Sequence, residues 1–202
     1  PVEEEVDYTS LASVEVLYQH GVYIEQDDPA RLAAGQSWHA TVKTRSPVRL
    51  ELPPEFLPAD SGVPCVLRLR LARPVTVNRI AIQPTSGAPI DLLGVFVHSA
   101  DGERLIVVGT GDRAIYEPMQ LDGPVVLKFP SHSTVSVDIV INQRHCEWVE
   151  RVSTGETWYE YRYGLKGIRI GQVRYLENGE WISRPLECPT ETGSILLSAE
   201  AN

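Results

Sequence analysis

The chain of 202 residues carries 27 acidic and 18 basic side chains, which gives a formal net charge of −9 at pH 7, and 43% of its residues are hydrophobic. The negative charge opposes broad contact with nucleic-acid phosphates, and the apolar content suits a folded protein of one domain plus arms. No apolar run approaches the ~20 residues of a membrane-spanning helix. We therefore predict a globular protein with no nucleic-acid and no membrane partner.

The first residues, Pro-Val-Glu-Glu-Glu, lack both an initiator Met and a signal-peptide pattern, so we expect a segment of a longer precursor. The three cysteines are Cys65, Cys146 and Cys188. An odd count without Cys-x-x-Cys spacing argues against a disulfide framework and a zinc site. We expect free or buried thiols in a reducing compartment.

The first third of the chain predicts an exposed arm followed by short strands. Residues 1–10 are acidic and polar, and 13–25 form two β-rich runs broken at His20-Gly21. A single helical turn is expected over 30–34, ended by Gly35. Strands are predicted over 38–44 and 48–52, before a Pro-rich surface loop.

The chain is organised around residues 66–83, in which apolar side chains alternate with arginines. Leu67, Leu69 and Leu71 would share one face of a strand, as Val75 and Val77 do after the Ala-Arg-Pro link. The apolar positions then change phase to Ile80 and Ile82. This slip predicts two strands with a bulge or sharp bend near Asn78-Arg79.

The second half predicts further strands separated by turns. Asp101-Gly102 is the strongest tight-turn signal, and Asn178-Gly179 is a second. Residues 109–122 are predicted as a loop, and 146–151 as either a strand or a short turn. The other predicted strands are 92–99, 104–108, 124–129, 134–142, 158–163, 165–175, 181–183 and 194–198.

About a dozen short strands with almost no helical periodicity predict an all-β fold, an antiparallel β-sandwich or jelly roll with extended terminal arms. A parallel α/β sheet is excluded because the crossover helices are missing. We divide the chain into an N-terminal arm with short strands (1–35), a sandwich domain (36–185) and a C-terminal arm or strand (186–202).

Two stretches resemble a known group of domains. Leu67-Arg-Leu-Arg-Leu-Ala-Arg-Pro-Val-Thr-Val-Asn-Arg-Ile-Ala-Ile resembles the core of galactose-binding-like or discoidin-like jelly rolls, and Tyr161-Arg-Tyr-Gly-Leu-Lys-Gly-Ile-Arg-Ile resembles their final strand. The following Asn178-Gly-Glu-Trp-Ile-Ser-Arg-Pro-Leu is similar to phage tail and other virion proteins that carry such a domain. The resemblance covers roughly residues 36–185 and rests on structural motifs. It implies a jelly roll whose loops can hold sugar or lipid.

No catalytic or metal-ligating constellation is found in the sequence. The five histidines form no ligand pair, and no serine lies in a Gly-x-Ser-x-Gly elbow. Cys146 and His145 would point to opposite faces of a strand. A calcium ion held by Asp27, Asp28, Asp101 and Asp112 remains a minor alternative. We predict no catalytic residue, no metal and no cofactor, and hence no enzyme.

The most informative aromatic residues are Tyr159, Tyr161 and Tyr163, which share one strand face, together with Trp181. One interpretation is that this face packs on the core. The other is a platform for a partner or a glycan, because aromatic rings contribute much interface energy.

Two functions follow. The first is a non-enzymatic structural component of a phage or virus particle (tail, neck or capsid-associated), made in the host cytoplasm and located in the virion. It would contact other virion structural proteins as a homo-oligomeric or multi-copy assembly, with the apolar Ile195, Leu196 and Leu197 as arm contacts. The alternative is a carbohydrate-binding module for surface glycans, in a receptor-binding or carbohydrate-active protein.

Overall fold

The computed structural model describes residues 3–18, 23–44, 64–86, 90–108, 119–143, 146–151 and 156–175. These residues form two short helical segments, η1 (Thr9–Leu11) and α1 (Ala30–Ala33). The strands are β1 (Glu3–Asp7), β2 (Ala12–Tyr18), β3 (Tyr23–Gln26), β4 (Trp38–Thr44), β5 (Cys65–Pro84), β6 (Ile90–His98), β7 (Arg104–Val108), β8 (Met119–Leu121), β9 (Val125–Asn142), β10 (Cys146–Arg151) and β11 (Glu156–Tyr175).

The strands pair in the order β3-β4-β11-β5-β9-β6-β7, with β1 and β10 joined to β11, β2 to β5, and β8 to β6. Every one of these pairings is antiparallel. The prediction of an all-β antiparallel jelly-roll sandwich is confirmed. Among the described residues no helix is long and apolar enough to span a membrane.

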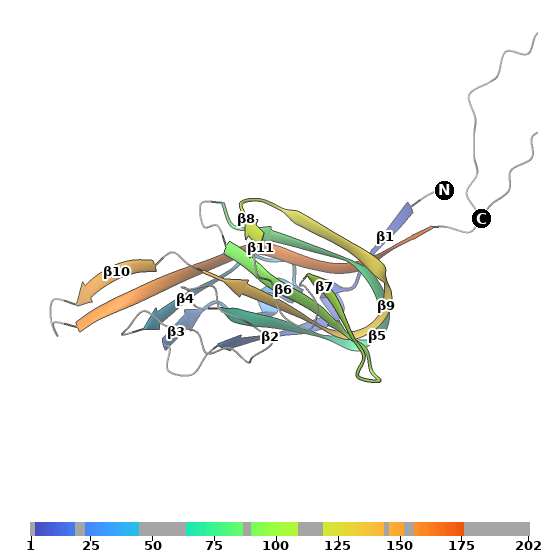
Figure 1. Ribbon diagram of the computed structural model, residues 1–202, viewed down its shortest axis with the longest axis horizontal. Helices are drawn as coiled ribbons and strands as arrows, with labels where there is room; N and C mark the ends of the chain where they lie inside the picture. The colour runs from blue at the N-terminus through green and yellow to red at the C-terminus, as the bar shows by residue number, and fades with distance from the viewer. Residues whose placement is uncertain are drawn as a thin grey trace, which may run out of the picture.

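The two layers of the sandwich share their longest strands. Residues 65–70 of β5 pair with β2 and with 136–141 of β9, whereas 79–82 pair with 125–128 of β9 and 168–171 of β11. Figure 1 shows β5 and β9 curving together from one layer to the other. We call the side with β2, β6, β7 and β8 the first layer, and the side with β1, β3, β4 and β11 the second.

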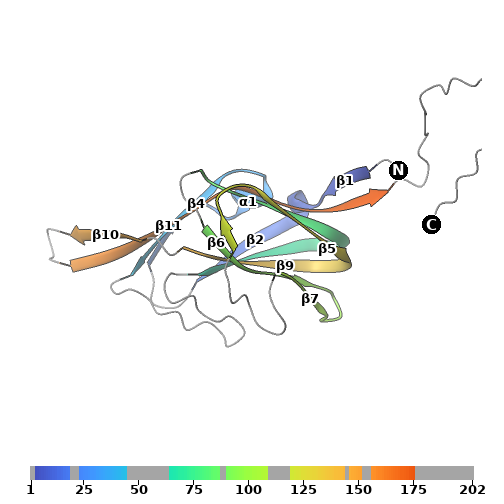
Figure 2. The ribbon, with the colours of Figure 1, turned by 45° about the horizontal axis from the view of Figure 1, so that its top comes forward.

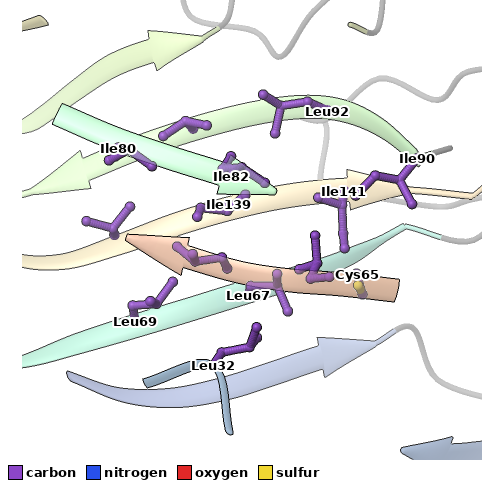
Figure 3. Close-up of a cluster of buried hydrophobic side chains, with 14 of the residues drawn as sticks. Leu32, Cys65, Leu67, Leu69, Ile80, Ile82, Ile90, Leu92, Ile139 and Ile141 are labelled. Carbon is purple, nitrogen blue, oxygen red and sulfur yellow. The ribbon is translucent and has the colours of Figure 1, made fainter. Parts of the chain in front are cut away.

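The core lies between the layers and is filled by the alternating apolar side chains of the long strands. Leu67, Leu69, Ile80 and Ile82 of β5 are fully buried. Figure 3 shows these side chains converging with residues from β6, β9 and α1. Each buried Leu or Ile contributes about 1.5–3 kcal/mol through the hydrophobic effect.

Cys65 is a free cysteine in this core, as predicted for a buried thiol. Burial raises the pKa of its thiol, which removes the thiolate needed for reactivity.

Three predicted strand pairs are single long strands. We expected breaks within 66–83, 124–142 and 158–175, but β5, β9 and β11 each run through. Pro74 and Pro130 lie where the β5–β9 register is interrupted, between Arg70 and Val75 and between Lys128 and His132. A proline lacks the N–H that a regular ladder needs, so it fits at such irregularities without ending the strand.

The prediction of an N-terminal arm is wrong in one respect: the described residues pair into the sheet, although several of their side chains are exposed. β1 pairs with residues 171–175 of β11, and the Ile170 amide donates to Thr9 Oγ1 at 2.7 Å. Arg174 Nε donates to Glu4 Oε2 at 2.5 Å, in a pair whose side chains are 52% and 41% exposed. β1, β2 and β3 therefore belong to the same sheet as the strands of the predicted 36–185 domain.

Several local predictions are confirmed. β4 and β7 have the predicted bounds, and α1 is followed by Gly35, whose φ of 68° is the left-handed conformation that glycine adopts most easily. Gly102, at the predicted tight turn, has φ 90°. The predicted 109–122 loop is wrong at residues 119–121, which form β8. Residues 146–151, predicted as either a strand or a short turn, are the strand β10. The predicted elements at 48–52, 178–179, 181–183 and 194–198 lie outside the described residues.

The sheet extends beyond the sandwich at both ends. Figure 2 shows β10 with the first part of β11 projecting at one end, and β1 with the last part of β11 at the other.

Candidate functional site

The predicted aromatic platform lies inside the protein. Tyr161 and Tyr163 are 3% and 2% exposed and belong to the core cluster, and Tyr159 is partly buried against it. Neither buried ring presents a face to a sugar or a partner, so the core-packing interpretation describes them. Trp181 and the predicted arm contacts Ile195, Leu196 and Leu197 lie outside the described residues.

The calcium alternative finds no support among the described residues, which contain no group of three His, Cys, Asp or Glu side chains placed to hold a metal ion. Asp27 Oδ2 accepts a hydrogen bond from the His39 amide at 3.0 Å. Asp28 Oδ1 accepts one from the Ala30 amide at 2.9 Å. Asp112 lies outside the described residues.

A groove of about 320 Å³ lies on the outer face of the second layer, over β9, β5 and β11. We call it the basic groove. Its lining consists of Gly35, Arg79, Ala81, Ile82, Gln83, Pro124, Val125, Val126, Lys166, Gly167, Ile168 and Arg169.

The strand register explains the shape of the basic groove. Ala81 lies opposite Val126 on one side and Arg169 on the other, and Gln83 lies opposite Gly167. Residues directly opposite in neighbouring strands point to the same face. Small residues at Ala81 and Gly167 therefore form a floor between longer side chains.

Arg79 faces the groove in phase with Ala81, directly after a change of phase in β5. Val77 and Ile80 are both fully buried, so two residues, Asn78 and Arg79, separate two inward positions. The pairing with β9 shifts register between Val77 and Arg79, which confirms the predicted slip. Asn78 Nδ2 donates to the Val173 carbonyl at 2.9 Å, and Asn78 Oδ1 accepts from the Val173 amide at 2.8 Å. These two hydrogen bonds join β5 to β11 at the change of phase.

A second bulge, in β11, places Lys166 at the same groove. Leu165 and Ile168 are buried, and the register with β5 shifts between Leu165 and Gly167. The extra residue leaves two positions, Lys166 and Gly167, between the inward Leu165 and Ile168, and Lys166 is exposed. β-bulges of this kind re-aim side chains and are over-represented next to functional sites.

The polar groups of the groove are available to a ligand. Within the part of the chain that the structure describes, Lys166, Arg169 and Gln83 have no ion pair or side-chain hydrogen bond. Arg79 Nε lies 3.5 Å from Glu5 Oε1, and the Glu5 side chain is 61% exposed. The Arg79 side chain itself is 18% exposed, so Arg79 is the least accessible of the groove's cations and its ion pair is partly screened by solvent on the Glu5 side.

A smaller depression of about 160 Å³ adjoins the groove at β1 and shares Arg79 and Arg169 with it. Glu5 and Asp7 also line this depression. The surface therefore changes from basic over β5–β11 to mixed in charge beside β1.

Sequence reasoning missed this groove, although one of its bulges was predicted. The spacing of Leu165, Ile168 and Ile170 carries the same change of phase as Val77, Ile80 and Ile82. Only the register of β5 against β11 brings the two bulges to one face.

No protein-family model matches the chain, and no curated protein matches it. Similar solved structures include SpGH29, with a TM-score of 0.50 and 15% identity over 84% of this chain and 28% of that one. A second is the family 32 carbohydrate-binding module of C. perfringens NanJ in complex with galactose, with a TM-score of 0.47 and 14% identity over 84% of this chain and 100% of that one. A third is CpGH89CBM32-5 from Clostridium perfringens in complex with GalNAc-β-1,3-galactose, with a TM-score of 0.44 and 14% identity over 82% of this chain and 99% of that one. At these identities the likeness is one of fold.

Proposed function

We propose that this chain is a carbohydrate-recognition module that binds a saccharide in the basic groove. The observation that carries the proposal is that one groove combines a floor of small residues with Lys166, Arg169 and Gln83, which have no ion pair or side-chain hydrogen bond within the described residues. Fold alone would not support it, because one fold hosts many functions.

The lining matches the two kinds of surface that a sugar ring presents. Its hydroxyls need hydrogen-bond partners, which Arg79, Arg169 and Gln83 offer, and its C–H faces need apolar contact, which Ala81 and Val126 offer. The volume of about 320 Å³ lies at the lower end of small-molecule sites, which span ~300–1,000 Å³. That size suits one or two sugar units of a longer glycan.

The role as a structural component of a phage or virus particle stays a prediction, as does location in the virion. A receptor-binding virion protein would combine it with glycan recognition, so the two roles are compatible. The groove favours recognition, since a spacer between neighbours does not need a floor of small residues beside side chains that make no ion pair or side-chain hydrogen bond within the described residues.

The proposal is tested by screening the purified chain on a glycan array of neutral and acidic saccharides, followed by calorimetric titration of the best ligands. Ala81→Phe places a ring on the floor of the groove and should weaken binding about tenfold or more, because it fills the site. Thr76→Phe is the matched control, since Thr76 is an exposed residue of the same strand outside the groove.

Urea unfolding should show that both variants fold. The proposal is wrong if no saccharide binds, or if Ala81→Phe binds as tightly as the unmodified chain.

A further inference from the structure

The charge of the basic groove is the opposite of that of the whole chain. Its described lining contains Arg79, Lys166 and Arg169 and no acidic residue. The chain as a whole has a net charge of −9. A neutral saccharide needs donors and acceptors together, whereas this lining offers mainly donors that are also cations.

Two of the cations lie at irregularities of the backbone. Arg79 lies at the β5 bulge and Lys166 at the β11 bulge, while Arg169 faces outward in the regular part of β11. Lys128 of β9 lies directly opposite Arg79 and adds a fourth cation beside the groove. Three neighbouring strands thus direct positive charge to one face.

Two of the three lining cations, Lys166 and Arg169, are not neutralised within the described part of the protein. Lys166 and Arg169 make no ion pair there, and the partner of Arg79, Glu5, lies toward the β1 depression at 3.5 Å. Planar guanidinium groups bind carboxylate and sulfate-like anions through two parallel hydrogen bonds, and such charge-assisted bonds are about twice as strong as neutral ones.

We propose that the basic groove selects saccharides that carry an anionic group, a carboxylate or a sulfate ester, and that Arg169, Lys166 and Arg79 bind that group. The anion lies over β5 and β11, and the neutral part of the glycan extends toward β1, where Glu5 and Asp7 repel a second negative charge and accept hydrogen bonds from hydroxyls. This inference rests on the proposed function and names its ligand class.

The test is a calorimetric titration of the folded chain with four probes of similar length. These are an oligogalacturonate, its methyl ester, a sulfated galacto-oligosaccharide and a neutral galacto-oligosaccharide. Methyl esterification removes the charge and keeps the ring, so it should weaken binding about tenfold or more. Raising NaCl from about 0.05 to about 0.5 M should weaken binding of the anionic probes and leave the neutral probe unchanged.

Two groove variants and one control locate the effect. Arg169→Gln and Lys166→Gln should each lower affinity for the anionic probes about tenfold, and they should lower affinity for the neutral probe less, because glutamine still hydrogen-bonds hydroxyls but carries no charge. Arg70→Gln removes an exposed arginine that lies opposite Ser136 in the first layer, away from the groove, and should change nothing.

The four probes and the variants distinguish failure of this inference from failure of the proposed function. Preference for the oligogalacturonate assigns the site to carboxylates, and preference for the sulfated probe assigns it to sulfate esters; both support the inference. Equal affinity for the methyl ester, or no effect of Arg169→Gln and Lys166→Gln, overturns the inference. If binding of neutral saccharides is then still lost in Ala81→Phe, the proposed function stands. If no probe and no array saccharide binds, both are overturned.

Discussion

Arg68 on β5 and Asp138 on β9 form an ion pair through two hydrogen bonds on the outer face of the first layer, with Nε–Oδ1 2.8 Å and Nη2–Oδ2 2.9 Å. His98 Nε2 of β6 lies 3.2 Å from the same Oδ2. The carboxyl side chain of Asp138 is only 9% exposed, so its charge is compensated by specific partners rather than by water.

Replacing Arg68 should therefore lower the free energy of unfolding more than replacing Arg70, which lies on the same face of β5. Arg68→Ala leaves the buried Asp138 carboxylate without its bidentate partner and should lower the free energy of unfolding by about 1.5–3 kcal/mol. Arg70 is exposed, and its Nη2 lies as far as 3.7 Å from Glu15 Oε2. Arg70→Ala should therefore lower the free energy of unfolding by only about 0–1 kcal/mol. Urea unfolding measures both, and equal losses would contradict the ranking.

The same pair predicts a dependence of stability on pH. Burial alone would raise the pKa of Asp138, but the hydrogen bonds from Arg68 and His98 outweigh it and hold that pKa at about 2, below the ordinary value of 3.8. A carboxyl with a lowered pKa stabilises the fold above its unfolded-state pKa, and this contribution is lost as the pH falls through about 4 to about 2.

Unfolding in urea at a series of pH values tests this. The difference in unfolding free energy between the unmodified chain and Asp138→Asn should narrow as the solution is acidified. A difference that stays constant down to the lowest pH would show that Asp138 has no lowered pKa.

Gly171 is required where β1 meets β11. A Cβ built there would lie 2.3 Å from the Val6 carbonyl oxygen, which belongs to the backbone and cannot rotate away. Gly171→Ala should therefore release β1, seen as faster amide hydrogen exchange in residues 3–7. Gly167→Ala is the control on the same strand, since its added Cβ meets nothing within 4 Å. Unchanged protection of β1 in Gly171→Ala would contradict the packing.

Asn78 links the stability of the β5 bulge to the groove. Asn78→Ala removes both hydrogen bonds to Val173 and should lower the free energy of unfolding by about 1–3 kcal/mol. Because Arg79 follows directly, binding of an anionic saccharide should weaken as well, although Asn78 is not a lining residue of the groove. Loss of stability with unchanged affinity would show that Arg79 is positioned without Asn78.

The sequence predicted those strands whose bounds depend on local signals. β4 and β7 were predicted to the residue, because alternation and the Asp101-Gly102 turn mark their ends. β5, β9 and β11 were divided in two because Pro74, Pro130 and the glycines of β11 suggest breaks. Whether a strand bends or ends at such a residue depends on its partner strand, which a local pattern does not contain.

The candidate site was predicted less well than the fold. The phase change at Asn78-Arg79 indicated a bulge, but its meeting with Lys166 depends on the register of strands about 90 residues apart in the chain. The alternation over residues 66–83 indicates only that Arg68 faces away from the core, because its partner Asp138 is 70 residues away. The arm prediction failed for the same reason, since β1 pairs with residues more than 160 positions later.

The shared strands also determine how the protein responds to a mechanical load. Since β5 and β9 belong to both layers, the two layers stay covalently joined through these strands even if the ladder of one layer opens. Pulling on β1 and β10, which project at opposite ends of β11, would load a single covalent strand across the sandwich, with β4 and β5 hydrogen-bonded along it in shear.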